Sequence, residues 1–306
     1  MKTNMVKQRN SEKRNVNRQV IIIGAGPAGI ACAVQLKRQG IEPMIIEKNE
    51  IGGLILNANK IENYTGFPNG ISGIQIAKLL KKHLEHWTIE IVYDNVVGVN
   101  FGKDGLYEID CEYGLYNSEF LVIATGTKPK EVDFYIPENC MDKIFYEVYP
   151  LLNTKNKQIT IVGSGDAAFD YALSLANNNQ VRILNRTDKI KALNLLVEES
   201  RKIINIQYYQ NAIITEINEI GDKLQVTGSR NKKRYKDESD YLIFAIGREP
   251  NLDILSSLIQ SRKNLLLKSK KLFLIGDVKN EKYRQLSIAV GNGVKAAMEI
   301  QDSLKV

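Results

Sequence analysis

Two glycine-rich runs in this 306-residue sequence have the residue types and spacing that bind the pyrophosphate of a dinucleotide. In the first, Gly24, Gly26 and Gly29 follow an apolar, β-branched run and open a segment with helical periodicity. The first glycine permits a tight turn, the second lets the backbone approach a pyrophosphate, and the third packs helix on strand. Glu47 ends the next apolar run, where a carboxylate accepts hydrogen bonds from a ribose. This run therefore predicts a dinucleotide-binding βαβ unit.

A second run repeats this pattern later in the chain. Gly163, Gly165 and Ala168 again follow an apolar run and open a helical segment. The strand expected next ends in Asn185 and Arg186 rather than in an acid. An acid there favours the free ribose of NAD, whereas an arginine can pair with the 2′-phosphate of NADP. The run favours a second dinucleotide site with NADPH preferred, and the alternative is a unit that has lost its ligand and serves as scaffold.

A third element, Gly276 and Asp277, lies between an apolar run and a long helical segment. A carboxylate there can hold a ribityl hydroxyl, and the start of the helix directs its positive dipole end at an electron-rich ring. The runs FLVIATG at 120–126 and YLIFAIG at 241–247 are also alike. The repetition predicts two similar domains.

Other segments complete an α/β pattern. A helix is expected near residues 74–87, a small antiparallel insert at 89–99 and 106–111, and a final strand and helix within 271–300. The composition, 43% apolar and 25% charged, is that of a soluble globular protein. The sequence contains no apolar stretch long enough to span a bilayer.

Taken together, these motifs resemble the low-molecular-weight thioredoxin reductase family. The matching stretches, in family order, are GAGPAG from Gly24, the pair Gly52 and Gly53, IENYTGFPNGISG at 61–73, ATG at 124–126, GSGDAA at 163–168, AIGREPN at 245–251, and Gly276-Asp277 with YRQ at 283–285. The resemblance implies FAD and either NADPH or NADH as cofactors, and a homodimer. It also implies two Rossmann-like three-layer domains, with a nicotinamide domain at 128–247 inserted into a discontinuous FAD domain at 19–127 and 248–306.

The resemblance also assigns roles to residues. Segments around Gly52 and Asn63 are expected to line the FAD, Asp277 to hold its ribityl-pyrophosphate region, and residues 284–286 to approach the isoalloxazine. No side chain is expected to act as a covalent catalyst, because the chemistry is centred on the flavin. The residues expected to bind the cofactors are Gly24, Gly26, Pro27, Ala28, Gly29, Glu47, Lys48, Gly52, Gly53, Leu54, Asn59, Asn63, Val97, Ala124, Thr125, Gly126, Gly163, Ser164, Gly165, Asp166, Ala167, Arg186, Lys191, Ile246, Gly247, Gly276, Asp277, Arg284, Gln285 and Leu286.

The sequence departs from the family at the redox-active cysteine pair. Thioredoxin reductases place CxxC shortly before the second glycine run, because electrons must pass by thiolate attack on a disulfide. Here the corresponding stretch runs from Tyr146 to Tyr149 and holds no cysteine. Cys32 is expected to be a packing residue in the first helix, Cys111 to end a strand, and Cys140 to lie in a polar turn. The absence of paired cysteines favours the cytoplasm.

A second departure concerns the basic stretch that binds phosphate in the family. It reads NRTDKIKA at 185–192, so Arg186 matches, Lys191 replaces an arginine, and Thr187 stands where another arginine is usual. A lysine supplies a point charge but no bidentate fork. The resemblance therefore implies a reduced or altered preference for NADPH.

Further charged groups have simpler interpretations. Residues 1–18 hold six basic residues and one acid, which predicts a disordered basic arm; contact with a nucleic acid, a membrane or a partner is the alternative. The body is nearly neutral, so no nucleic-acid partner is expected. His83 and His86 are expected on a solvated helix face rather than in a metal site. The basic cluster at 230–236 predicts an exposed hairpin, or a docking site for an acidic electron carrier.

We therefore expect an FAD-dependent oxidoreductase that transfers hydride from NAD(P)H to FAD and onward without an internal dithiol. A ferredoxin-like protein, flavodoxin or a small molecule could accept the electrons. A related branch of the family lacks the cysteines and reduces ferredoxin or flavodoxin, but it carries a C-terminal extension that does not follow the last expected helix here. The competing class is a flavin-binding redox or interaction protein without nicotinamide turnover.

Overall fold

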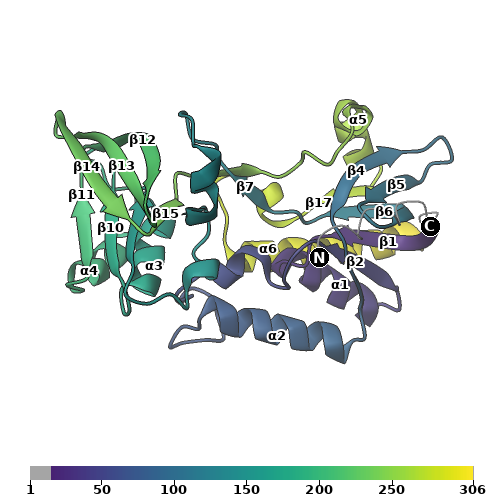
Figure 1. Ribbon diagram of the computed structural model, residues 1–306. Helices are drawn as coiled ribbons and strands as arrows, with labels where there is room; N and C mark the ends of the chain where they lie inside the picture. Colours follow the sequence, from purple (N-terminus) through teal and green to yellow (C-terminus); the bar gives the residue numbers. More distant parts are fainter. Residues whose placement is uncertain (1–14, 306) are drawn as a thin grey trace, which may run out of the picture. The chain divides into compact units, whose positions relative to one another are not determined.

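The computed structural model describes residues 15–305, which form two compact units (Figure 1). Unit 1 contains residues 15–55, 76–127 and 250–305, and unit 2 contains residues 56–75 and 128–249. Residues 1–14 of the expected basic arm lie outside the described residues. Residues 15–18 are not part of an arm, because they start the first strand and pair with residues 115–118.

Unit 1 is built on one seven-stranded sheet in the order β3-β2-β1-β6-β5-β4, with β17 also paired to β6. Its strands are β1 (Asn15–Ile23), β2 (Pro43–Glu47), β3 (Glu90–Tyr93), β4 (Val96–Phe101), β5 (Tyr107–Cys111), β6 (Leu115–Ile123) and β17 (Leu272–Leu274). Strands β4, β5 and β6 pair antiparallel, as expected for the insert. Strand β3 was expected in that insert but pairs parallel with β2, because a helix returns the chain to the same edge before it begins.

Side chains alternate along β1, so each face of this sheet packs into a different hydrophobic core. Val20 and Ile22 pack with the helices on one side, while Ile21 and Ile23 pack on the other. The helices of the first core are α1 (Pro27–Arg38), α2 (Gly73–His86) and α6 (Leu286–Leu304). The second core is closed by α5 (Ser257–Lys268), which was not expected and begins where the Ser256 hydroxyl accepts from the Ile259 amide at 3.4 Å.

The backbones of helices α1 and α6 lie in contact, because the residues between them are small. A Cβ atom on Gly293 of α6 would lie 2.2 Å from the Ala28 carbonyl oxygen of α1. The flanking residues of α6 at this contact, Ala289, Ala296 and Ala297, are buried. The spacing of small residues along α6 therefore sets how closely this helix approaches the start of α1.

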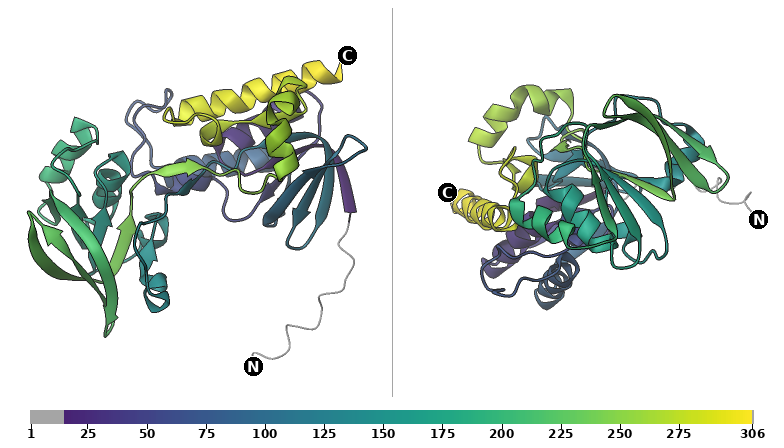
Figure 2. Two further views of the ribbon diagram at one scale, coloured as in Figure 1. Left: turned by 90° about the horizontal axis from the view of Figure 1, so that it is seen from above. Right: turned by 90° about the vertical axis from the view of Figure 1, so that its left-hand side faces the viewer.

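Unit 2 repeats the architecture on a smaller scale. Its five-stranded parallel sheet has the order β11-β10-β9-β15-β8, and a three-stranded antiparallel sheet, β12-β13-β14, forms a separate layer, drawn in green in Figure 2. The elements are β8 (Ile144–Phe145), β9 (Gln158–Val162), α3 (Asp166–Leu175), β10 (Gln180–Leu184), α4 (Asn194–Arg201), β11 (Ile206–Tyr209), β12 (Ala212–Ile220), β13 (Lys223–Arg230), β14 (Lys233–Ser239) and β15 (Tyr241–Phe244). A two-stranded ribbon pairs β7 (Thr127–Pro129) with β16 (Arg248–Pro250). Within each of these strands the chain passes from one unit to the other.

The division of the chain differs from the expected domain boundaries at residues 56–75 and, by two residues, at 248–249. Residues 56–75, which carry the ENYTGFP motif, group with unit 2 rather than with unit 1. Within unit 2 the Asn59 amide donates to the Asp170 carboxylate at 2.9 Å, and the Tyr149 amide donates to the Asn57 side chain at 3.0 Å. These hydrogen bonds attach the segment to α3 and to the stretch that replaces the cysteine pair.

The α1–α6 contact predicts opposite effects for two glycines of one helix. Gly293→Ala should lower the free energy of unfolding by about 2 kcal/mol, because the new methyl group overlaps the Ala28 carbonyl. Gly291→Ala, with no atom within 4 Å of its added Cβ, should leave it unchanged or raise it by up to about 1 kcal/mol. Urea unfolding of both variants measures the difference, and equal values would contradict the packing argument.

Candidate functional site

The first glycine turn connects β1 to α1 and is fixed by main-chain contacts from two other strands. The Gly24 amide donates to the Ile46 carbonyl at 2.8 Å, and the Ala124 amide donates to the Ile23 carbonyl at 2.9 Å. A Cβ on Gly24 would lie 2.5 Å from the Ala124 oxygen, and its φ is +109°. Only glycine fits there, so the first glycine is needed for folding.

The other two glycines of the turn differ in what surrounds them. A Cβ on Gly29 would lie 2.1 Å from the Gly24 oxygen, so this glycine is required by helix–strand packing. A Cβ on Gly26 would meet no atom within 4 Å, and its backbone is extended, with φ −78° and ψ 178°. Protein packing therefore does not explain Gly26, whereas the approach of a pyrophosphate to the start of α1 does. The turn fits a dinucleotide.

Glu47, at the end of β2, is held beside this turn. Only 8% of its surface is exposed. One carboxylate oxygen accepts from the Ala25 amide at 2.6 Å and the other from the Asn49 amide at 2.8 Å. Each oxygen has a further lone pair. The two amides thus fix the carboxylate in a position from which it can also accept from a ribose.

Two further sequence-distant segments converge on the first turn. The Gly52 amide donates to the Ala25 carbonyl at 2.9 Å, and a Cβ on Gly53 would lie 3.6 Å from Gly26. A Cβ on Gly276 would lie 2.8 Å from the Ala28 methyl group. The structure therefore brings together expected FAD residues from five segments, namely 24–29, 47, 52–53, 124 and 276.

The second glycine turn in unit 2 has the same main-chain geometry. The Gly163 amide donates to the Leu184 carbonyl at 3.0 Å, and the Ala245 amide donates to the Val162 carbonyl at 2.8 Å. A Cβ on Gly163 would lie 2.4 Å from the Ala245 oxygen, while a Cβ on Gly165 would meet no atom within 4 Å. The first two positions of the two turns therefore match, while Ala168 replaces the third glycine, and this geometry fits a second dinucleotide.

The loop after β10 is organised by Asn185, which takes the place of Glu47. Its side chain donates to the Lys189 carbonyl at 3.0 Å and to the Tyr208 hydroxyl at 2.9 Å, and it accepts from the Thr187 amide at 3.2 Å. The Lys191 amide donates to the Ser164 carbonyl at 2.8 Å, which joins this loop to the glycine turn. Arg186 and Lys191 are exposed there.

The remaining expected site residues fall into three groups. Val97 is 52% exposed at a bulge in β4, and Asn63 lines an open hollow of about 320 Å³ formed by residues 62–68 of unit 2. Asp166 accepts from the Leu193 amide at 2.8 Å rather than facing only outward, and Thr125 donates to the Asn251 carbonyl at 2.6 Å. The others divide between the two units. Those in unit 1 are Pro27, Ala28, Lys48, Leu54, Gly126, Asp277, Arg284, Gln285 and Leu286, and those in unit 2 are Asn59, Ser164, Ala167, Ile246 and Gly247.

The stretch that replaces the cysteine pair is packed into unit 2. The Tyr146 ring lies 5.9 Å from the Phe244 ring, and Val148 is fully buried. Between them Glu147 pairs with Arg248 and accepts from the Tyr171 hydroxyl at 3.1 Å. Burial raises the pKa of Glu147, and the Arg248 charge opposes that rise. A half-buried, ion-paired carboxylate thus lies where the resemblance implies a dithiol in the family, and no local pattern predicts its partners.

All three cysteines of the sequence are buried, and none is in a disulfide. Cys111 ends β5 as expected, and burial raises the pKa of the Cys32 thiol, which suits a packing residue. Cys140 was expected in a polar turn, but it is fully buried in a hydrophobic cluster because η2 (Glu138–Lys143) turns it inward. No thiol of the chain has the exposure that disulfide exchange requires.

Metal and membrane chemistry find no support in the described residues. His83 and His86 are both exposed on α2, as expected for a solvated face. Over residues 15–305 no cluster of histidine, cysteine and acidic side chains is arranged to hold a metal ion. In the same range no helix is long and apolar enough to cross a membrane.

The fold and the paired turns define a two-dinucleotide α/β oxidoreductase. Residues 18–293 match the pyridine nucleotide-disulphide oxidoreductase family, and the chain belongs to it. Similar proteins include the thioredoxin reductase of Buchnera aphidicola subsp. Schizaphis graminum, 28% identical over 92% of this chain and 96% of its own. The "34.2 kDa protein in rubredoxin operon" of Clostridium pasteurianum is 28% identical over 91% and 94%. The crystal structure of T. acidophilum thioredoxin reductase matches with a TM-score of 0.81 and 26% identity, over 95% of this chain and 99% of that one.

These similarities confirm the expected fold class and family. The chain is a thioredoxin reductase-like flavoprotein of the oxidoreductase class that uses FAD and NAD(P)H. The lack of any protein atom within 4 Å of a Cβ at Gly26 or Gly165 leaves room for a pyrophosphate to approach each turn. FAD would be held by residues around the first turn, and the nicotinamide nucleotide by those around the second.

Gly26 provides a direct test of the first turn. Gly26→Ala should weaken FAD binding at least about tenfold, because the methyl group occupies the space that a pyrophosphate needs. Stability of the FAD-free protein should change by less than about 1 kcal/mol, since nothing in the protein contacts that methyl group. Flavin content after dialysis and urea unfolding of the apoprotein measure the two effects. Full retention of FAD would refute the assignment.

Asp170 provides a test through pH. Its pKa is raised from 3.8 to about 6, chiefly by burial, although the Asn59 and Lys60 amides oppose the rise and the Asp166 and Glu199 charges add to it. The folded chain then binds more protons than the unfolded chain between these pH values. The stabilisation that protonated Asp170 contributes to the folded chain is fully present below about pH 4 and is lost as the pH rises through about 6.

Asp170→Asn should remove this titration. The free energy of unfolding of the variant, relative to that of the natural chain, should rise by about 1–2 kcal/mol between about pH 4 and about pH 7. Urea unfolding at several pH values measures the change. Asp188→Asn, at an exposed carboxylate, is the control. A difference that stays constant with pH would rule out a buried Asp170.

Proposed function

We propose that this chain is an NAD(P)H-dependent flavoprotein reductase that passes electrons to an acceptor without a dithiol of its own. The observation that carries the proposal is the coexistence of two matching dinucleotide turns with a cysteine-free stretch at residues 146–149, in which Val148 is buried. The turns support the binding of two dinucleotides. The packed Tyr146 and Val148 side chains argue against reduction of a thioredoxin disulfide by way of this stretch.

The roles of the chain follow from that division of labour. FAD, when bound, supplies a ring that accepts hydride and can release electrons singly or in pairs. The amides at the start of α1 would hold its pyrophosphate, Glu47 its ribose and Asp277 its ribityl region. In unit 2 the start of α3 would hold the nicotinamide nucleotide, with Arg186 and Lys191 at the adenosine end. The full set of cofactor-binding residues given above is proposed on this basis.

A small redox protein or a small oxidised molecule is proposed as the acceptor. Similarity to a protein from a rubredoxin operon supports an electron carrier of the ferredoxin or rubredoxin type. A small acceptor would need no docking surface. The absence of disulfides among the buried cysteines supports a reducing compartment such as the cytoplasm, and we propose a homodimer by resemblance to the family.

A flavin-binding protein without nicotinamide turnover is the second candidate. The observation that favours it is Thr187, which replaces a basic residue of the family's phosphate-binding stretch. The preserved geometry of Gly163 and Gly165 opposes it, because a turn that had lost its ligand would not need open space at Gly165.

Anaerobic reduction separates these two candidates. Addition of NADPH or NADH to the purified FAD-loaded protein should abolish the absorbance of oxidised flavin within seconds at millimolar nucleotide. The reduced protein should then transfer electrons to a small oxidant such as ferricyanide. Failure of both nucleotides, with dithionite still able to reduce the flavin, would replace the reductase proposal with the flavin-binding alternative.

A further inference from the structure

Two basic segments that are distant in sequence meet at one residue of unit 2. The Asn211 amide donates to the Thr187 carbonyl at 3.2 Å, and the Asn231 amide donates to the Asn211 carbonyl at 3.0 Å. Thr187 belongs to the loop after β10, and Asn231 is at the tip of the β13–β14 hairpin. Asn211 therefore holds the hairpin tip beside the loop that follows the second glycine unit.

The hairpin tip is a tight turn with an unusual residue in it. Arg230 pairs with Lys233, so Asn231 and Lys232 form a two-residue loop, and their φ angles are +49° and +64°. Such turns favour Asn followed by Gly, because both positions need a positive φ. A lysine in the glycine position stores strain, which suggests that its charge is used.

Tyr209, at the end of strand β11, contacts both segments. The Arg230 guanidinium lies 4.6 Å from the centre of the Tyr209 ring, and the Tyr209 carbonyl accepts from the Asn185 amide at 2.9 Å. Stacking on a ring leaves the edge of a guanidinium available to donate two parallel hydrogen bonds. The charged residues of the two segments are Arg186, Asp188, Lys189 and Lys191 in the loop and Arg230, Lys232, Lys233 and Arg234 in the hairpin.

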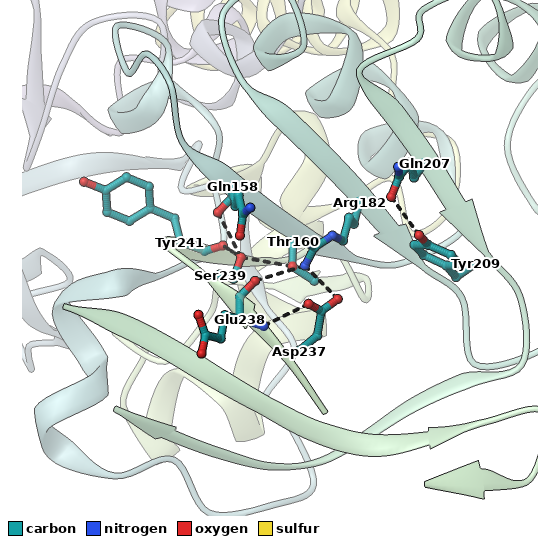
Figure 3. Close-up of polar contacts among 9 residues, drawn as sticks. All are labelled: Gln158, Thr160, Arg182, Gln207, Tyr209, Asp237, Glu238, Ser239 and Tyr241. Atoms are coloured by element: carbon teal, nitrogen blue, oxygen red, sulfur yellow. Dashed lines mark hydrogen bonds and ion pairs between the residues drawn. The ribbon is translucent and has the colours of Figure 1, made fainter. Parts of the chain in front are cut away.

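Further from its tip, the hairpin is held against the five-stranded parallel sheet of unit 2. Arg182 of β10 pairs with Asp237 of β14 at 2.7 Å and donates to the Glu238 carbonyl at 2.9 Å (Figure 3). The Ser239 hydroxyl at the end of β14 lies 3.0 Å from the Thr160 hydroxyl of β9. These contacts fix β14 against the parallel sheet, so the position of the tip is set by the fold rather than by the turn alone.

We propose that Arg230, presented by this hairpin, is the second arginine of the site that receives the 2′-phosphate of NADPH. In the βαβ unit the 2′-position of the adenosine ribose faces the residues that end the second strand, here Asn185 and Arg186. Thr187 removes one guanidinium from that loop, and the Arg230 guanidinium stacks on Tyr209 beside it. Arg186 and Arg230 then clamp the phosphate from two segments, with Lys191 and Lys232 as point charges. This inference rests on the proposed use of a nicotinamide nucleotide.

Binding of nucleotide fragments tests Arg230 without relying on hydride transfer. Calorimetry with 2′,5′-ADP and with 5′-AMP, on the FAD-loaded protein, reports the 2′-phosphate separately from the rest of the adenosine. Arg230→Met should weaken 2′,5′-ADP at least about tenfold and leave 5′-AMP within about twofold, because only one ligand has the phosphate. The KM for NADPH should rise similarly, while the KM for NADH stays constant.

Matched variants make the outcome decisive. Lys223→Met removes one positive charge from the other end of β13, about 23 Å along the strand, and should have no effect on either ligand. Arg186→Ala should weaken 2′,5′-ADP. If Arg186→Ala has that effect and Arg230→Met behaves like Lys223→Met, the inference is wrong while the reductase proposal stands. If the natural chain binds 2′,5′-ADP no more tightly than 5′-AMP, the inference is also wrong, and anaerobic reduction by NADH still decides the proposed function.

Discussion

The close approach of main chain to main chain at the two glycine turns is the constraint on which both units depend. At Gly24 and again at Gly163 the chain passes so near the carbonyl of a neighbouring strand end that a Cβ would lie 2.5 or 2.4 Å from its oxygen. Each turn is therefore enclosed by the strand pair that flanks it, and each helix starts at a fixed point. The helix starts are where two dinucleotides can be held by amides.

Other features of the chain are consequences of that geometry or modifications of it. In unit 1 an acid, Glu47, is locked by two amides beside the turn, whereas in unit 2 Asn185 organises a basic loop at the equivalent place. The same architecture thus provides two kinds of site. The site in unit 1 suits a free ribose, and the site in unit 2 suits a phosphate. At residues 146–149, where the resemblance implies a dithiol in the family, Glu147 pairs with Arg248 instead and no thiol is present.

The sequence predicted what depends on local spacing. The glycine turns, the strands that flank them, the missing cysteine pair and the exposed hairpin at 230–236 are all readable from residue types at short separations. It could not predict contacts that depend on tertiary packing. Helix α5 lacks strong periodicity and was missed, Cys140 is buried although its neighbours are polar, and Asp170 meets Asn59 only through the fold. The proximity of Arg230 to the loop at 185–191 depends likewise on Asn211 bridging two segments.

The number of electrons that the protein stores shows whether a dithiol exchanges electrons with the flavin. A flavin alone accepts two electrons, whereas a flavin with a redox-active dithiol accepts four. An anaerobic dithionite titration of the FAD-loaded protein should therefore reach its end point at one two-electron equivalent per FAD, with no further uptake. An end point at two equivalents would contradict the account, because it would require a dithiol that exchanges electrons with the flavin.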